Sequence, residues 1–286
     1  MSAAPRVFVV VLSALCAGSG SSDVQAPASL AHRYDFEHRR QRFELPGRLD
    51  EVSGLAFDAA GTLLAHDDER GIVYRIDPEE GSADRGFRMG DTTIRDDFEG
   101  IAVAGERIFL VSSRGLLYEL RAAPERTDTP VRVTDTRLGR TCEVEGLAYR
   151  AEGDELLLAC KTLPAGSAEI RVHRLPLDPD VPAPPPIRAP FSRLVPFGLD
   201  RGFHPSGLEV DPATGRLVLV AAVEEALVEL EPDGTVVSVV ELSRSRHPQP
   251  EGIAFGPDGL LYLADEANGR NARVSVYGPP EPRARP

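Results

Sequence analysis

The sequence lacks or is poor in several residue types, and each shortage narrows the possible functions. It contains no tryptophan, which argues against an aromatic platform for carbohydrate. Acidic residues outnumber basic ones by 45 to 32, which gives a formal charge of −13. This excess of negative charge argues against nucleic acid or an anionic membrane surface as a partner and favours cations.

Lysine is the scarcest charged residue, because Lys161 is the only lysine among 32 basic residues. Genome composition explains most of this preference for arginine. A second interpretation is that Lys161 is retained at a position that needs a compact ammonium group, which the planar guanidinium of arginine cannot imitate.

Long hydrophobic runs are confined to the N-terminus. Arg6 is followed there by an apolar run from Val7 to Leu15 and then by small residues. This pattern predicts a secretory signal peptide over residues 1–22, which is too short for a stable membrane anchor. Cys16 leaves a lipid-anchored form as the alternative, although the residues before it fit a lipidation motif poorly, and only that form would involve a membrane.

We therefore expect an exported protein, periplasmic or secreted and monomeric. Its predicted parts after the signal peptide are a flexible linker over 23–40, a folded domain over 41–278 and a disordered tail over 279–286. Export places the protein in an oxidising compartment, which permits a disulfide between the two remaining cysteines, Cys142 and Cys160.

A repeat organises the folded domain. A Gly-Leu/Ile step, as in "FEGIAV" and "VEGLAY", recurs five times at intervals of 46, 46, 61 and 45 residues. Its glycines are Gly54, Gly100, Gly146, Gly207 and Gly252. The long interval contains a proline-rich insertion at 176–190, and without it the interval also approaches the common period.

Each repeat contains a short strand, a turn rich in Gly, Asp and Pro, and further strands that alternate, as in "GLLYELR". Four short antiparallel strands at this period predict an all-β fold, a five-bladed β-propeller with four-stranded blades. The last repeat lacks its fourth strand, so we expect the N-terminal segment 41–46 to complete that blade and close the ring. A six-bladed ring, with 170–200 as a degenerate blade, is the alternative.

In a propeller, the first strand of each blade begins at one mouth of the central channel and the second strand returns to it. Side chains before each glycine and at the end of each second strand should therefore share that mouth. The first set is Ser53, Glu99, Glu145, Ser206 and Glu251. The second set is Asp67, Asp68, Ser112, Ser113, Lys161, Ala221, Ala222, Asp265 and Glu266.

Glutamates that converge on a narrow channel repel one another unless they take up protons or bind a cation. Carboxylate, hydroxyl and carbonyl oxygens suit Ca²⁺ better than zinc, and only His66 lies near this face as a zinc ligand. Two other interpretations stay open: the glutamates could latch neighbouring blades by hydrogen bonds, or they could be catalytic. Lys161 could neutralise Glu145 across one hairpin, or reach an anionic ligand.

The cysteines are also expected at this face. Cys142 lies a few residues before the first strand of the third blade, and Cys160 lies at a corresponding place at the end of the second strand of that blade. Hairpin geometry could therefore place the two cysteines opposite each other. The alternative is two separate thiols. The spacing does not match a Cys-x-x-C redox motif.

The blade-start phrases and "HPQPEGIAFGPDGLLYLADEAN" resemble the SdiA-regulated family, the YjiK-like β-propellers of bacteria, over most of residues 50–277. The resemblance implies a five-bladed ring, calcium binding and an envelope location, and no known reaction. The positions that match the family pattern are Glu99, Glu145, Lys161, Ser206, Glu251, Asp265, Glu266 and Asn268. From the blade geometry and this match together, we expect Glu99, Glu145, Glu251 and Glu266 as metal ligands and Asp67, Ser112, Lys161, Asp265 and Asn268 as ligand-binding residues. The sequence departs from the family pattern at "VSSR" (111–114) and at Ala221–Ala222. Both differences remove oxygen donors from the expected calcium site.

Two functions are compatible with these residues. One is a binding module whose calcium-stiffened mouth recognises a small ligand or an envelope protein. The other is a metal-dependent hydrolase of lactones, esters or phosphate esters, in which the cation polarises the substrate and a carboxylate activates water. The G-x-S-x-G, H-E-x-x-H, P-loop and EF-hand motifs are absent. His204 lies two residues before Ser206, but the sequence pattern makes no acidic third partner for a Ser-His pair evident.

Overall fold

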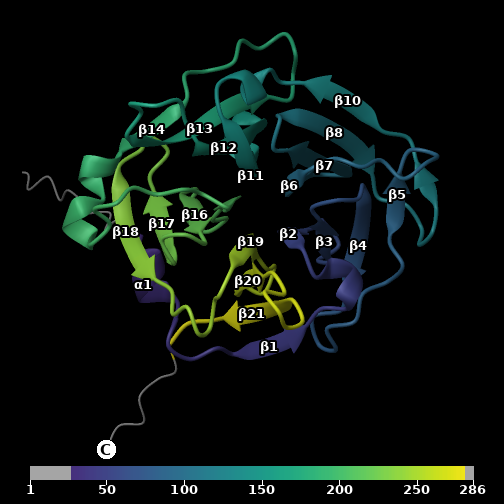
Figure 1. The fold of residues 1–286 in the computed structure, drawn as a ribbon, viewed down its shortest axis with the longest axis horizontal. Coiled ribbons are helices and arrows are strands. Elements are labelled where there is room, and N and C mark those ends of the chain that lie inside the picture. Colours follow the sequence, from purple (N-terminus) through teal and green to yellow (C-terminus); the bar gives the residue numbers. More distant parts are fainter. Residues whose placement is uncertain (1–26, 281–286) are drawn as a thin grey trace, which may run out of the picture.

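Five blades surround a central axis in the computed structural model, which describes residues 27–280 (Figure 1). The first blade contains β2 (Val52–Phe57), β3 (Leu63–Asp67), β4 (Ile72–Ile76) and β5 (Phe87–Met89), with β9 (Asp128–Thr129) added in parallel at its edge. The second contains β6 (Phe98–Ala104), β7 (Arg107–Ser112), β8 (Leu116–Arg121) and β10 (Arg132–Asp135). The third contains β11 (Glu143–Arg150), β12 (Glu155–Thr162), β13 (Glu169–Pro176) and β14 (Ile187–Pro190).

The fourth blade contains β15 (Gly207–Val210), β16 (Leu217–Ala221), β17 (Ala226–Leu230) and β18 (Val236–Glu241). The fifth contains β19 (Pro250–Phe255), β20 (Leu261–Asp265) and β21 (Arg273–Tyr277), and its outer strand is β1 (Gln41–Glu44). β1 pairs antiparallel with β21, with Phe43 opposite Val274, so the N-terminal strand closes the ring as predicted.

The six-bladed alternative is wrong. The segment proposed as a degenerate blade supplies β13 and β14, which pair with each other through Arg171 and Arg188 and complete the third blade. Residues 177–186 of the proline-rich insertion lie between these two strands, and its last four residues form β14. The prolines within 177–186 cannot donate ladder hydrogen bonds, so this part forms a loop and adds no new blade.

The core is divided into five apolar layers, and each lies between two neighbouring blades. Between the first and second blades, for example, Leu64 and Val73 pack with Ile101 and Leu110. The inner strands are buried at nearly every position, as in β16 (Leu-Val-Leu-Val-Ala), and successive side chains point to opposite faces. Both faces of each sheet are therefore apolar, and the neighbouring blades cover them.

The repeated glycines let the innermost strands touch. A Cβ added at Gly207 would lie 2.2 Å from the carbonyl oxygen of Glu251, and one added at Gly100 would lie 2.9 Å from the Cβ of Leu147. Leu55, Ile101, Leu147, Leu208 and Ile253 follow these glycines and line the middle of the channel. The space left there is about 10 Å³, at the limit of what holds one water molecule, so the channel is plugged at its centre.

The expected flexible linker over 23–40 is wrong for its described part. Residues Leu30–Arg33 form the short helix α1, and Leu30 is fully buried. The Leu30 amide donates to the buried carboxylate of Glu229, 2.8 Å away on β17, and Arg33 forms an ion pair with Asp211. These contacts fix the segment to the fourth blade. The predicted signal peptide, Cys16 and residues 281–286 of the predicted tail lie outside the described residues.

Between residues 27 and 280, none of the helices is long and apolar enough to cross a membrane.

Candidate functional site

Four glutamates and the single lysine gather at one end of the channel, which we call the acidic mouth. Glu99, Glu145 and Glu251 lie on the inner strands β6, β11 and β19, Lys161 lies on β12, and Glu266 follows β20. They therefore come from the second, third and fifth blades.

A local irregularity explains how the inner strands present these carboxylates. The pairing of the first and second strands shifts between Phe98 and Gly100, between Val144 and Gly146, and between Pro250 and Gly252. The residue skipped by each shift is the glutamate. A β-bulge leaves one residue out of the ladder and re-aims its side chain. In the first blade the skipped residue is Ser53, and its hydroxyl donates to the carbonyl oxygen of Glu51, 3.2 Å away.

Lys161 neutralises part of this charge. Its Nζ lies 3.1 Å from Oε1 of Glu145, and the side chains are 31% and 3% exposed, respectively. Burial opposes the charge on Lys161, but Glu145, Glu251 and Glu99 together raise its pKa above the ordinary value. The predicted salt bridge across the β11–β12 hairpin is therefore present.

One ammonium group cannot compensate four carboxylates. Burial, with the charge of Glu145, raises the pKa of Glu99 to about 10. Burial and the charge of Glu266 raise the pKa of Glu251 to about 8. The pKa of Glu145 is also raised by burial, although Lys161 and a hydrogen bond from Glu99 oppose the shift. Without an added cation, the acidic mouth therefore retains protons at neutral pH, and Glu99 and Glu145 share one as a hydrogen-bonded pair.

Asp68 belongs to the site more clearly than Asp67. Burial and the charge of Glu51 raise the pKa of Asp68 to about 7, and Asp68 in turn helps to raise the pKa of Glu266 to about 7. Its Oδ1 is buried without a hydrogen-bond partner among the described residues. Asp67 instead accepts from the backbone and side chain of Arg70, with an ion pair of 2.8 Å. Successive residues at the strand end point in opposite directions, which is why only one of the two is free.

Three other predicted ligand-binding residues have different surroundings. Asp265 is fully buried and lies 2.9 Å from Nδ1 of His247, whose Nε2 lies 2.6 Å from the hydroxyl of Tyr277. The hydroxyl of Ser112 is buried and accepts from the amide of Leu116 at 3.3 Å, within the turn to β8. Asn268 is exposed, with a left-handed φ of 38°. These residues stabilise turns and a buried network around the site.

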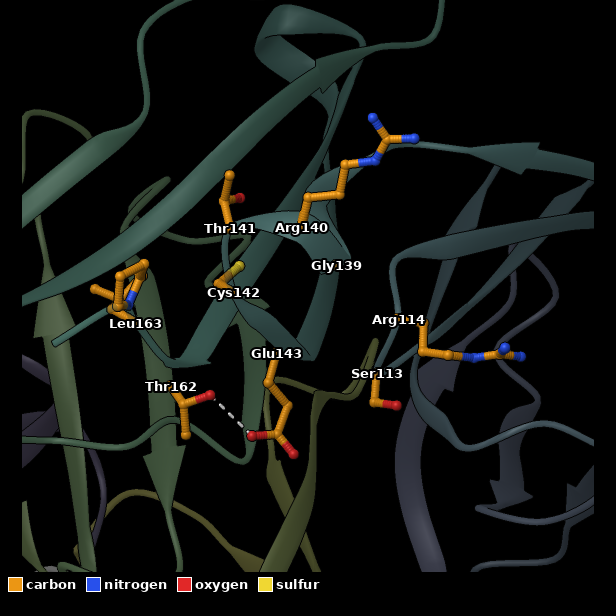
Figure 2. Close-up of a pocket in the computed structure, with 10 residues that line it drawn as sticks. Ser113, Arg114, Gly139, Arg140, Thr141, Cys142, Glu143, Thr162 and Leu163 are labelled. Atoms are coloured by element: carbon orange, nitrogen blue, oxygen red, sulfur yellow. Dashed lines mark hydrogen bonds between the residues drawn. The ribbon is translucent and has the colours of Figure 1, made fainter.

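The predicted disulfide is present: Cys142 and Cys160 are joined by a 2.09 Å bond across the start of the third blade. Cys142 also lines a pocket of about 420 Å³ between the second and third blades (Figure 2). Its polar wall contains Thr162, which donates to Glu143 at 2.9 Å, and the guanidinium groups of Arg114 and Arg140 extend on the side away from Leu163. The pocket adjoins the acidic mouth along the chain, because Glu143 and Thr162 neighbour Glu145 and Lys161.

Fold and site together define a five-bladed β-propeller with an acidic channel mouth. The SdiA-regulated family model matches residues 28–269, and the chain belongs to this family.

Solved structures share the architecture at low sequence identity. Glutaminyl cyclase from Myxococcus xanthus is 19% identical, with a TM-score of 0.59 and coverage of 85% of this chain and 97% of that one. A luciferin-regenerating enzyme is 11% identical, with a TM-score of 0.55 and coverage of 83% and 95%. A glucose dehydrogenase is 16% identical, with a TM-score of 0.55 and coverage of 84% and 100%. Likeness at this level concerns the fold and leaves the activity open.

Proposed function

We propose that the acidic mouth binds Ca²⁺ and that the protein is an exported binding module that holds a small ligand beside this ion. The observation that carries the proposal is the convergence of Glu99, Glu145, Glu251 and Glu266 on one partly buried site that contains a single ammonium group.

The chemistry of the donors fits calcium. Carboxylate oxygens at a site of several acidic residues are the ligands Ca²⁺ prefers, and a divalent cation would replace the protons that these glutamates otherwise retain. Zinc prefers histidine and thiolate. Among the described residues, the only group of three histidine, cysteine or carboxylate ligand atoms within 4.8 Å of one another is Cys142, Cys160 and His173, where the two sulfurs are bonded to each other. Oxygens from any three glutamates of the acidic mouth lie farther apart than this, so they would have to move closer together around the ion. Glu99, Glu145 and Glu251 would hold the ion, with Glu266 and Asp68 next to them.

The pocket beside the mouth suits a ligand that carries an anionic group. Arg140 is exposed and its guanidinium has no hydrogen bond or ion pair among the described residues, whereas Arg114 is held by Asp96 at 2.6 Å. A carboxylate or phosphate in this pocket could reach the guanidinium of Arg140, which lines it. The 420 Å³ volume is within the range of small-molecule sites.

Export is supported by the disulfide, because such bonds persist in oxidising compartments. The N-terminal signal pattern of the sequence points the same way.

Calcium titration of the purified chain tests the proposal. We expect Ca²⁺ to raise the melting temperature and a chelator to reverse the rise, since an ion that binds only the folded state stabilises it. The triple variant Glu99→Gln, Glu145→Gln, Glu251→Gln should lose the response. A matched variant at an exposed glutamate, Glu80→Gln, should keep it. No shift at millimolar calcium, or a full shift in the triple variant, would refute the site.

Hydrolysis is the second candidate, and the Glu99–Glu145 pair favours it. A carboxyl group that stays protonated at neutral pH beside an ionised one can act as a general acid. A panel of lactones, aryl esters and phosphate esters, assayed with and without calcium, distinguishes enzyme from binder. Turnover that disappears in Glu145→Gln would establish the enzyme, whereas no turnover with intact calcium binding would leave the binding module.

A further inference from the structure

The opposite end of the channel has a different chemistry, and we call it the apolar mouth. Each inner strand reaches this end with the third residue after its glycine. These residues are Phe57, Val103, Tyr149, Val210 and Phe255. With Ala56, Ala102, Glu209 and Pro212 they line a cavity of about 170 Å³. The plug of leucine and isoleucine side chains separates this cavity from the acidic mouth.

One charged residue interrupts the pattern. The second residue after the glycine is alanine in four blades, at Ala56, Ala102, Ala148 and Ala254, whereas the fourth blade has Glu209. The only hydrogen bond of the Glu209 carboxylate among the described residues comes from the adjacent Val210 amide at 2.8 Å, and no ion pair neutralises it. Burial raises the pKa of Glu209 to about 8. The ionised Glu209 carboxylate therefore has no positively charged side chain beside it among the described residues.

The lining indicates which cation would suit the cavity. Three of the residues around it, Phe57, Tyr149 and Phe255, are aromatic, and aromatic faces attract cations that carry little water. A metal ion would need several oxygen ligands, and the cavity provides one carboxylate. A methylated ammonium group combines positive charge with an apolar surface. Its size also fits, since a cavity of ~150 Å³ accommodates benzene.

We propose that the apolar mouth binds a small organic ammonium ion, of the methylated or quaternary type, with Glu209 as the counter-ion and the aromatic side chains around its alkyl groups. This site is separate from the proposed calcium site and does not depend on it. The arrangement excludes anions, and it disfavours neutral molecules of the same shape because Glu209 would remain unpaired.

The test compares choline and tetramethylammonium with 3,3-dimethylbutan-1-ol, the neutral isostere of choline, by calorimetric titration of the whole chain. We expect the wild-type protein to bind the two cations at least ~10-fold more tightly than the neutral compound. Calcium and chelator should leave this preference unchanged.

Glu209→Ala introduces the residue of the other four blades, so the variant should fold, and Glu209→Gln keeps the size of the side chain. Both should bind choline no better than the isostere. Glu99→Gln, at the acidic mouth, should keep the preference. Equal binding of choline and isostere by the wild type, no binding of tetramethylammonium at ~10 mM, or a preference lost in Glu99→Gln and kept in Glu209→Ala would overturn the proposal.

Discussion

The Lys161 ammonium group lies 3.1 Å from the Glu145 carboxylate, and this contact joins the only lysine of the chain to an almost fully buried acid. Replacement of Lys161 by Met leaves that carboxylate without its counter-ion. We expect the free energy of unfolding in chelator to fall by about 2 kcal/mol, less than for a fully buried pair because Lys161 is partly exposed. Urea denaturation measures the change.

Arg95→Met is a matched control for this variant. Arg95 and Glu69 form an ion pair of the same length, 3.1 Å, but both side chains are more than half exposed, at 69% and 58%. Its loss should change the free energy of unfolding by less than ~0.5 kcal/mol. Equal changes in the free energy of unfolding for the two variants would mean that the Lys161–Glu145 contact stabilises the fold no more than an exposed ion pair does.

The acidic mouth should make stability depend on pH. The folded state holds protons on Glu251 and Glu266 up to pKa values of about 8 and about 7, whereas the unfolded chain loses them near the ordinary value of 4.5. The folded state therefore binds more protons between these limits, and stability falls as pH rises through the window. In chelator, we expect the melting temperature to decrease from pH 6 to pH 9.

Calcium should cancel this dependence, because the ion takes the place of the protons, and its apparent affinity should increase with pH. Melting curves at a series of pH values, with saturating calcium and with chelator, measure both effects. Glu251→Gln should have a flatter profile in chelator than the wild type. A profile that calcium does not alter would speak against these groups as ligands.

The repeated glycines of the inner strands should tolerate no side chain where two strands approach most closely. Gly207→Ala places a Cβ 2.2 Å from the Glu251 carbonyl oxygen, so the backbone of one of the two strands must move. We expect a loss of about 2–3 kcal/mol in the free energy of unfolding and weaker calcium binding through the displaced Glu251. Gly47→Ala, whose nearest neighbour would be 3.5 Å away, is the control and should be close to neutral.

The disulfide should contribute strongly to stability. Cys142 and Cys160 are 18 residues apart, and closing a loop of this size is worth about 3 kcal/mol in the unfolded state. The double variant Cys142→Ser, Cys160→Ser should lose about this amount and become insensitive to reductant. Mass spectrometry after alkylation checks the bond directly, since two labelled thiols in unreduced protein would mean that it is absent.

The fold was predictable because its signals are local and repeated. The Gly-Leu/Ile step marks every inner strand, and the unpaired strand at 41–46 pointed to the closure of the ring. The docking of α1 was not predictable, because it depends on the contact of Leu30 with Glu229, 199 residues away. No local sequence pattern indicates a partner at such a distance along the chain.

The site was predictable only in part. The residue before each glycine could be found by alignment of the repeats, since the bulge recurs with the motif. The choice between Asp67 and Asp68 depends on how a turn directs two adjacent side chains, and Arg70 decides it. Glu209 stands where the other four repeats have alanine, two residues after the glycine. Comparison of the repeats at that position could have identified it.

The pairing of β1 with β21 has a consequence for biogenesis. The two strands come from opposite ends of the chain, with Gln41 opposite Val276, so the last blade cannot be completed until nearly all of the protein has been synthesised. Until then β1 exposes unsatisfied backbone groups that favour intermolecular pairing. A chain truncated near its C-terminus would therefore remain an open, aggregation-prone arc, and cleavage just after β1 would unfasten a finished ring.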